Sequence, residues 1–371
     1  MGSALQKHRL PLLLLGIIAL LAGVWAGLVR AGWHWSMWQP QLAAAHGPLM
    51  VSGFLGSVIG LERTVALNLL LKPTVWQRRL LLLGPLSAGA GGLLLVGGWG
   101  GETAVWLLWS SSAAMTAMFW PMLRRHAALH TTVMATGAGC WLVGNTLWGL
   151  GQPLHLVVWW WAAFLLLTIA GERLELSRLL RIKPWQRWLF GTAILLLLTG
   201  LLLTQWHFSA GVRLFGAALA GLALWLWRYD IARRNRRRTG LTRYIAFCLL
   251  AGYGWLLFSG VAAVAAGAVA AGFLYDAILH GIFLGFVFSM IFGHAPIIFP
   301  AVLGIPLPYH PRFYIHFLLL HAALLLRAAA DLAGWAPGRL WGSLFNGVAL
   351  LLFLVMTIDG LRRGRSLKSV S

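Results

Sequence analysis

The stretch HGIFLGFVFSMIFGH, residues 280–294, begins and ends with histidine and carries no charged residue in between. Hydrocarbon tolerates such a run far better than it tolerates the two imidazoles, so the segment predicts a membrane-spanning helix with a histidine at each end. On an α-helix, the spacing between His280 and His294 corresponds to a rise of about 21 Å and to nearly whole turns. The two side chains are therefore expected on one helix face at opposite depths, where they cannot bind the same metal atom.

The rest of the chain is similar in composition to this segment. Of the 371 residues, 60% are hydrophobic and only 10% are charged, and the mean hydropathy is +0.80. We expect an all-α, polytopic membrane protein that forms a single integral membrane domain over residues 1–371. Twelve apolar spans are predicted, near residues 10–29, 46–71, 80–98, 103–122, 130–150, 154–171, 189–206, 210–227, 243–270, 274–303, 312–331 and 340–358.

The net charge of +21 arises from short basic clusters between the apolar spans. Cytoplasmic loops of membrane proteins carry such clusters, so we expect membrane lipid as a partner and do not expect nucleic acid. With a cytoplasmic amino terminus, 25 of the 29 basic residues lie inside, and only Arg30, Arg213, Arg327 and Arg339 lie outside. This asymmetry predicts a multi-pass protein of a bacterial-type cytoplasmic (inner) membrane with both termini in the cytoplasm.

An internal repeat groups the predicted helices into three sets of four. The segments from His46 and from His155 share a histidine, an apolar span, a Glu-Arg pair and a Lys-Pro followed by Trp-Gln-Arg. The segment from His280 repeats the His-Gly start of the first and has His294 near the place of the Glu-Arg pair. We expect these three histidines to open helices two, six and ten, and the Glu-Arg pairs to form ion pairs or contact lipid headgroups at the inner face. The predicted pseudo-repeats cover about 1–125, 126–240 and 241–371.

Histidines inside the spans are the strongest candidates for function, because ionisable side chains are costly at that depth. Neutral imidazole is a good ligand for haem iron or copper, and two helices of a bundle can each present one histidine to a haem. Small residues follow His46 and His280; they would admit the macrocycle or simply allow close helix packing. Further histidines gather toward the inner face, either as a second metal or haem site or as a basic interfacial cluster; they are His126, His130, His294, His310 and His316.

Twelve helices in three units of four, with histidines on helices two, six and ten, resemble the catalytic subunit of haem–copper oxidases. The chain is more closely similar to the NnrS family of haem- and copper-containing membrane proteins. The likeness to NnrS lies in AAAHGPLMVSGF (43–54), in DAILHGIFLGFVFSMIFGHAPIIFP (276–300) and in HFLLLHAALLLR (316–327). The resemblance implies His46 and His280 as haem ligands. The repeat, the inner-face cluster and the histidines inside spans supply further candidate metal ligands, with copper as a candidate metal: His155, His294, His310, His316 and His321.

Two functions are compatible with these patterns. The first is a haem-binding membrane protein, with copper as a further candidate, in a redox or nitric-oxide-related role that includes a small gaseous ligand such as nitric oxide. Any haem should be non-covalent and b-type, because the attachment signature CxxCH is absent. The copper-binding histidine motifs that the oxidases carry on helices six and seven are also absent, so an oxygen-reducing proton pump is not expected.

The second function is a repeat-built transporter or channel in which histidines act as proton relays. Such a protein requires polar side chains at mid-membrane, and the spans contain few. The candidates are Asn145, Ser259, Ser289 and Asn346. This scarcity favours a buried apolar cofactor over a polar substrate path.

Overall fold

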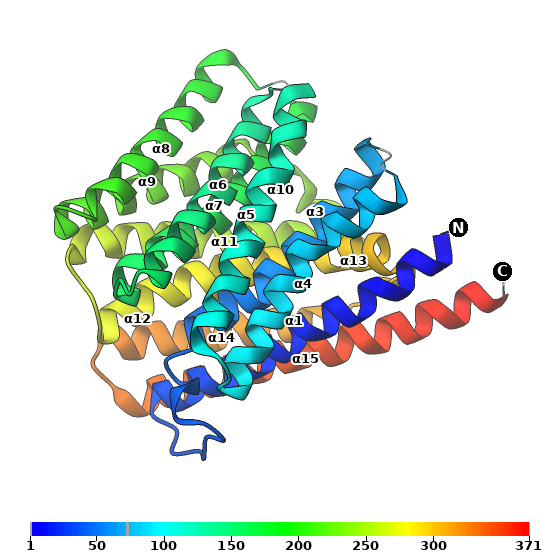
Figure 1. Ribbon diagram of the computed structural model, residues 1–371. Coiled ribbons are helices and arrows are strands. Elements are labelled where there is room, and N and C mark those ends of the chain that lie inside the picture. Colours follow the sequence, from blue (N-terminus) through cyan, green and yellow to red (C-terminus); the bar gives the residue numbers. More distant parts are fainter. Residues whose placement is uncertain (1, 72–73, 126, 181, 371) are drawn as a thin grey trace. The chain divides into compact units, whose positions relative to one another are not determined.

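The computed structural model describes residues 2–71, 74–125, 127–180 and 182–370, and the regular structure in these ranges is entirely helical (Figure 1). The first half of the chain forms α1 (Gly2–Ala31), α2 (His46–Pro48), α3 (Gly56–Leu71), α4 (Val75–Gly97), α5 (Gly101–Arg125), α6 (Leu129–Gly149) and α7 (Leu154–Leu176). The second half forms α8 (Pro184–Leu203), α9 (Phe208–Tyr229), α10 (Ala232–Asn235), α11 (Gly240–Ala266), α12 (Phe273–His280), α13 (Ser289–Leu303), α14 (Phe313–Leu332) and α15 (Ala336–Val370). Two π-helices, η2 (Leu49–Leu55) and η4 (Gly281–Phe288), and two short 3₁₀ turns, η1 (Pro40–Leu42) and η3 (Ser177–Leu180), complete the described structure.

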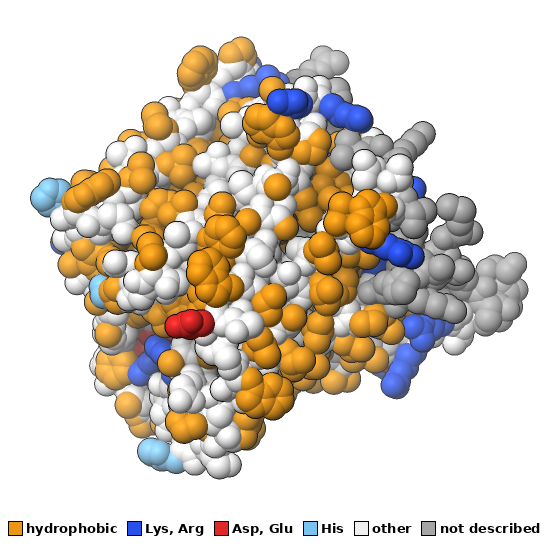
Figure 2. All heavy atoms as spheres, viewed as in Figure 1, with side chains coloured by type: hydrophobic (Ala, Val, Ile, Leu, Met, Phe, Trp, Pro, Cys, Tyr) orange, Lys and Arg blue, Asp and Glu red, His pale blue; other side chains and the backbone are white. Residues whose placement is uncertain are grey.

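The described residues contain 10 helical segments that are long and apolar enough to cross a membrane. The chain is therefore a multi-pass, all-α membrane protein, as the sequence predicts. The other two expected spans correspond to α5 and α6, which are helices of 25 and 21 residues with more polar side chains. Large hydrophobic side chains such as Leu195, Leu224 and Val261 remain exposed, and Figure 2 shows hydrophobic side chains spread over the visible surface.

The Trp-Gln-Arg motif that the sequence repeats marks the beginning of a helix at both of its positions. The Gln77 side chain accepts a hydrogen bond from the backbone N–H of Thr74, at 2.9 Å, just before α4. Gln186 accepts one from the backbone N–H of Lys183, at 2.8 Å, just before α8. Glutamine at the third helical position satisfies a backbone donor that would otherwise lack a partner. The motif thus has a local physical role as a helix start.

The chain folds into two compact units whose boundaries differ from the predicted repeat boundaries. Unit 1 contains Met1–Thr131, Ala138–Trp161 and Ile297–Pro306, and unit 2 contains Thr132–Gly137, Ala162–Pro296 and Leu307–Ser371. Unit 1 packs α1 against η2 and α4, and α4 against α3 and α5. Unit 2 packs α9 against α8 and α11, and α14 against α15.

A buried polar network holds the centre of unit 1. The Asn145 side chain accepts hydrogen bonds from Trp161 Nε1 at 3.0 Å and from Ser52 Oγ at 3.1 Å, and donates one to the carbonyl of Leu108 at 3.0 Å. Ser52 in turn accepts from Trp141 Nε1 at 2.9 Å. The network joins η2, α5, α6 and α7, and it supplies Asn145, which is fully buried, with protein partners for both ends of its amide.

Glycines allow α8 and α9 of unit 2 to approach each other closely. A Cβ atom at Gly200 would lie 2.5 Å from the backbone nitrogen of Phe215, and a Cβ atom at Gly211 would collide with the backbone of Thr204. Close backbone contact through small residues is a common way to join helices in lipid, where hydrophobic burial drives association weakly. The α8–α9 pair therefore depends on the absence of side chains at these positions.

Replacement of Gly211 by alanine should weaken this helix pair, because the new methyl group meets backbone that cannot rotate away. We expect a loss of about 1–3 kcal/mol in stability, typical of overpacking, measured by thermal or denaturant unfolding in detergent. Gly221, on the same helix, is the matched control, since a Cβ atom there meets nothing within 4 Å. Equal effects of Gly211→Ala and Gly221→Ala would contradict the packing argument.

Candidate functional site

His46 is the first residue of α2 and belongs to unit 1. Its Nδ1 lies 2.7 Å from the carbonyl oxygen of Gly23 on α1. A carbonyl oxygen can only accept, so Nδ1 donates this bond, and in a neutral imidazole the lone pair is then on Nε2. The ring lies against Gly27, where a Cβ atom would come within 2.7 Å of the imidazole Cε1. Helix α1 thus holds the imidazole in one orientation and one tautomer.

His280 belongs to unit 2, where it is the last residue of α12 and is followed directly by η4. The expectation that it opens a helix is wrong. The helix begins at Phe273, because FLYDAIL is itself apolar and helical and places Asp276 in the first turn, where a negative charge is favourable. The Nδ1 of His280 lies 2.9 Å from the carbonyl oxygen of Asp276 and 3.3 Å from its carboxylate. Both are acceptors, so His280 has the same tautomer as His46.

A π-helix follows both of these histidines within a few residues. The π-helix η2 begins at Leu49 and η4 begins at Gly281, with lengths of 7 and 8 residues. π-helices are rare and are frequently found at functional sites. His155, the third histidine of the predicted repeat, lies near the start of the regular α-helix α7. The structure therefore distinguishes His46 and His280 from His155 by local backbone geometry.

Indole rings cover several of the small residues that follow these histidines. Trp141 packs against Gly56, where a Cβ atom would come within 2.5 Å of the ring, and Trp255 packs directly on Gly285. Trp161 lies 3.5 Å from the place of a Cβ atom at Gly47. The sequence left two roles open for these small residues, which were to admit a haem macrocycle or to allow close helix packing. The indole contacts are close packing.

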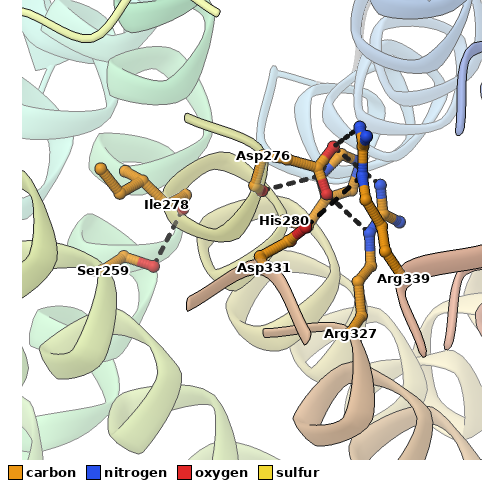
Figure 3. Close-up of polar contacts among 7 residues, drawn as sticks. All are labelled: Ser259, Asp276, Ile278, His280, Arg327, Asp331 and Arg339. Atoms are coloured by element: carbon orange, nitrogen blue, oxygen red, sulfur yellow. Dashed lines mark hydrogen bonds and ion pairs between the residues drawn. The ribbon is translucent and has the colours of Figure 1, made fainter. Parts of the chain in front are cut away.

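A cluster of charged side chains lies next to His280 (Figure 3). Arg327 of α14 forms two hydrogen bonds with the carboxylate of Asp276, from Nε at 2.7 Å and from Nη2 at 2.9 Å. Arg339 of α15 approaches the same carboxylate at 3.5 Å. The Asp276 side chain is only 12% exposed, so two guanidinium groups and one imidazole N–H compensate its charge in a largely dry setting.

Asp331 is the fifth ionisable member of this cluster. Its carboxylate is completely buried and lies 3.4 Å from Nε of Arg339. The cluster thus brings together two aspartates, two arginines and the Nδ1–H of His280. The cluster joins α12, α14 and α15 at one end of unit 2.

The sequence patterns pointed to His280, Arg327 and Arg339 but not to Asp276 and Asp331, which contact them. A signal was present, because the chain contains only eight acidic residues and both Asp276 and Asp331 lie at the same predicted end of an apolar span as the two arginines. Because the protein has so few acidic residues, a carboxylate at the end of a span is a candidate to form an ion pair with one of the few outer-face arginines.

The second histidine of the opening stretch, His294, has a different set of neighbours. Arg173 forms a buried ion pair with Asp230, with 2.8 Å between Nε and Oδ2, and its Nη1 lies 3.3 Å from Nε2 of His294. The Nδ1 of His294 lies 2.6 Å from the carbonyl oxygen of Met290. Both ring nitrogens thus have partners, and His294 would bind a metal only after Arg173 moves. The expected ion pair of the GER motif is confirmed for Arg173, with Asp230 as the acid.

The expectation that His280 and His294 share a helix face is wrong. The π-helix η4 lies between them, and each extra residue that a π-helix accommodates rotates the following side chains by about 100°. His280 accordingly lies beside Asp276 and the α14–α15 arginines, whereas His294 contacts Arg173 of α7.

Two further candidate ligands lie on α14. The Nδ1 of His321 accepts a hydrogen bond from Trp255 Nε1 at 2.9 Å, so its Nε2 carries the proton and faces Ser289 Oγ at 3.2 Å. The Nε2 of His316 lies 3.1 Å from the hydroxyl of Tyr244, and its Nδ1 lies 3.4 Å from the sulfur of Met356. Each imidazole is held by protein partners on both nitrogens.

The remaining candidates do not converge with these. His310 lies before α14 and accepts a hydrogen bond from the backbone N–H of Arg312 at 3.2 Å, while His155 belongs to unit 1. His126 lies outside the described residues. Within the described ranges, no three His, Cys, Asp or Glu side chains gather closely enough to hold a metal ion between them.

The helices and the buried histidines together define a multi-pass helical membrane protein with two polar centres in unit 2 and one oriented histidine in unit 1. The chain belongs to the family described as "Domain of unknown function (DUF8744)", which matches residues 9–361. No curated protein and no solved structure matches the chain.

The Arg173–Asp230 pair should behave as a buried ion pair in a double-mutant cycle. Asp230→Ala and Arg173→Met should each cost about 3–5 kcal/mol in stability, because each leaves a buried charge without its partner. The double variant should cost less than the sum of the two, measured by unfolding in detergent. Additive single effects would show that the two side chains are not energetically coupled.

Proposed function

We propose that this protein is a haem-binding integral membrane protein with a redox or nitric-oxide-related role, in which His46 and His280 are haem ligands. The proposed haem is b-type, and it is non-covalent because the chain contains no CxxCH sequence. Bound haem would supply one-electron chemistry and an iron that a small gas such as nitric oxide can coordinate. Copper at further histidines, including His155, His294, His310, His316 and His321, is part of the same proposal.

The matching tautomers of His46 and His280 carry this proposal. A histidine ligates haem iron through a nitrogen lone pair, and a hydrogen bond at the other nitrogen fixes the ring and increases its basicity. The Gly23 carbonyl does this for His46 at 2.7 Å, and the Asp276 carbonyl does it for His280 at 2.9 Å. In a neutral imidazole this hydrogen bond leaves the lone pair on Nε2, the nitrogen farther from the backbone, so the donor chemistry of both residues fits a haem ligand.

The surroundings of Asp276 support a ligand role for His280 in particular. A carboxylate beside Nδ1–H orients the imidazole and increases the electron density that Nε2 can donate. Arg327 holds this carboxylate with two hydrogen bonds and prevents it from rotating away. Asp276 is therefore a positioning residue for His280.

We also propose the finer topology that the sequence predicts. It comprises twelve membrane spans, with α5 and α6 as the two most polar, arranged as three pseudo-repeats of four. Both termini lie in the cytoplasm of a bacterial-type inner membrane. The helix-start role of Trp-Gln-Arg at α4 and α8 and the π-helices after His46 and His280 support an internal relationship.

A transporter or channel with histidine proton relays is the alternative. It requires polar side chains that face a route for the substrate. Asn145 instead bonds to Trp161, Ser52 and Leu108, Ser259 donates to the carbonyl of Ile278, and Ser289 donates to the carbonyl of Gly285. These partners give three of the four mid-span polar groups a structural role, which favours the haem proposal. The fourth, Asn346, donates to the carbonyl of Leu320 at 3.1 Å, and its buried amide oxygen has no partner among the described residues.

Absorption spectra of the detergent-purified protein from haem-replete cells, oxidised and dithionite-reduced, test the proposal directly. We expect a Soret band and a low-spin spectrum that His46→Ala and His280→Ala each abolish, because each removes an iron ligand. His34→Ala is the control and should leave the spectrum unchanged. The absence of a Soret band in the wild-type protein would refute haem binding, and a normal spectrum in either ligand variant would refute that assignment. Metal analysis of the same samples tests for copper.

Asp276→Asn should weaken haem retention without removing the ligand. Loss of a carboxylate partner behind a metal-bound histidine typically costs about 10–100-fold in affinity, measured here as haem release to apomyoglobin. Asp359→Asn is the matched control, because Asp359 is also paired with an arginine but its side chain is 53% exposed. Equal release rates in the two variants would show that Asp276 does not support His280.

A further inference from the structure

The segment between α9 and α11 carries seven arginines and one acid. This arginine loop, residues 228–243, contains Arg228, Arg233, Arg234, Arg236, Arg237, Arg238 and Arg243, and its only acidic residue is Asp230. All seven arginines are exposed. We propose that the arginine loop is a binding site for the phosphate groups of anionic phospholipids.

Asp230 does not neutralise this surface. Its side chain is 1% exposed and its carboxylate points inward to Arg173 at 2.8 Å. The same carboxylate accepts a hydrogen bond from the backbone N–H of Ala232 at 2.7 Å, which fixes the first turn of α10 beneath the arginines. The acid therefore anchors the loop, and the exposed side of the loop carries positive charge alone.

The apolar surface on both sides of the loop places it at headgroup level. Leu224 and Trp227 on α9 are 56% and 44% exposed, and Phe247 on α11 is 40% exposed. Both helices are among those long and apolar enough to span a membrane. Exposed apolar side chains of such helices face hydrocarbon, so Arg228, directly after Trp227, and Arg243, about one turn before Phe247, lie where phosphate groups begin. The other five arginines lie in the loop that joins these two positions.

The use of arginine instead of lysine in this loop indicates binding of phosphate groups and not only a general attraction to negative charge. Every basic residue of the loop is arginine and none is lysine. Arginine binds phosphate oxygens through a planar fork of N–H donors, whereas lysine acts as a compact point charge. Clusters of four to eight basic residues next to a membrane-spanning helix are typical of anionic-lipid binding.

Native mass spectrometry of the full chain in detergent tests this site, with phosphatidylglycerol and phosphatidylcholine offered as probes. We expect the wild type to retain phosphatidylglycerol preferentially. Simultaneous Gln substitution of Arg233, Arg234, Arg236, Arg237 and Arg238 should lower that preference by at least about tenfold, since each basic residue near a membrane surface contributes roughly fivefold. Substitution of the same five arginines by lysine preserves the positive charge needed for membrane insertion. It should lower the preference for phosphatidylglycerol several-fold, because lysine lacks the planar fork of N–H donors.

The control replaces Arg362, Arg363 and Arg365, the basic residues near the end of α15, by glutamine, and should bind lipid as the wild type does. Wild-type lipid preference in both loop variants would overturn the proposal, as would an equal loss in the α15 control. Displacement of the lipid by millimolar inorganic phosphate would indicate a site for soluble phosphate instead. Stronger retention of a short RNA than of phosphatidylglycerol would indicate nucleic acid, and either result would also overturn the lipid assignment.

Discussion

Hydrocarbon offers no hydrogen-bond partner, so each polar group inside a span must find one within the protein. Several buried polar side chains meet this constraint by bonding to one another in short series. Trp141 donates to Ser52, which bonds to Asn145; Trp255 donates to His321, which faces Ser289. These series cross between helices, so the same bonds that satisfy polar atoms also select which helices pack together.

Charges follow the same constraint more strictly, because an isolated buried charge is far more costly than an isolated hydroxyl. Arg173 and Asp230 neutralise each other, and Asp276 and Asp331 balance Arg327 and Arg339. Such pairs contribute little net stability, but removal of one partner is costly. They therefore specify helix neighbours: α7 with the end of α9 in one case, and α12 with α14 and α15 in the other.

The positions of the helices could be predicted because an apolar run of about 20 residues is a strong local signal, and every predicted span is helical over most of its length. The Asp276–Arg327 pair was missed. Its residues are 51 positions apart, so no local pattern encodes the contact, and only the scarcity of acids in the sequence pointed to Asp276 as a partner of an outer-face arginine. The π-helices were also missed. A fully apolar run such as GIFLGFVF has no periodicity from which the residues per turn can be read. The shared face of His280 and His294 was wrong for that reason.

The two π-helices also affect how related chains must be compared. A π-helix holds an extra residue relative to an α-helix over the same length, so loss of one residue restores regular α geometry without opening a loop. Within Leu49–Leu55 and Gly281–Phe288, a one-residue alignment gap between family members would therefore signify a change of helix type. The histidine before the gap would be conserved in sequence yet turned by about 100° relative to everything after it.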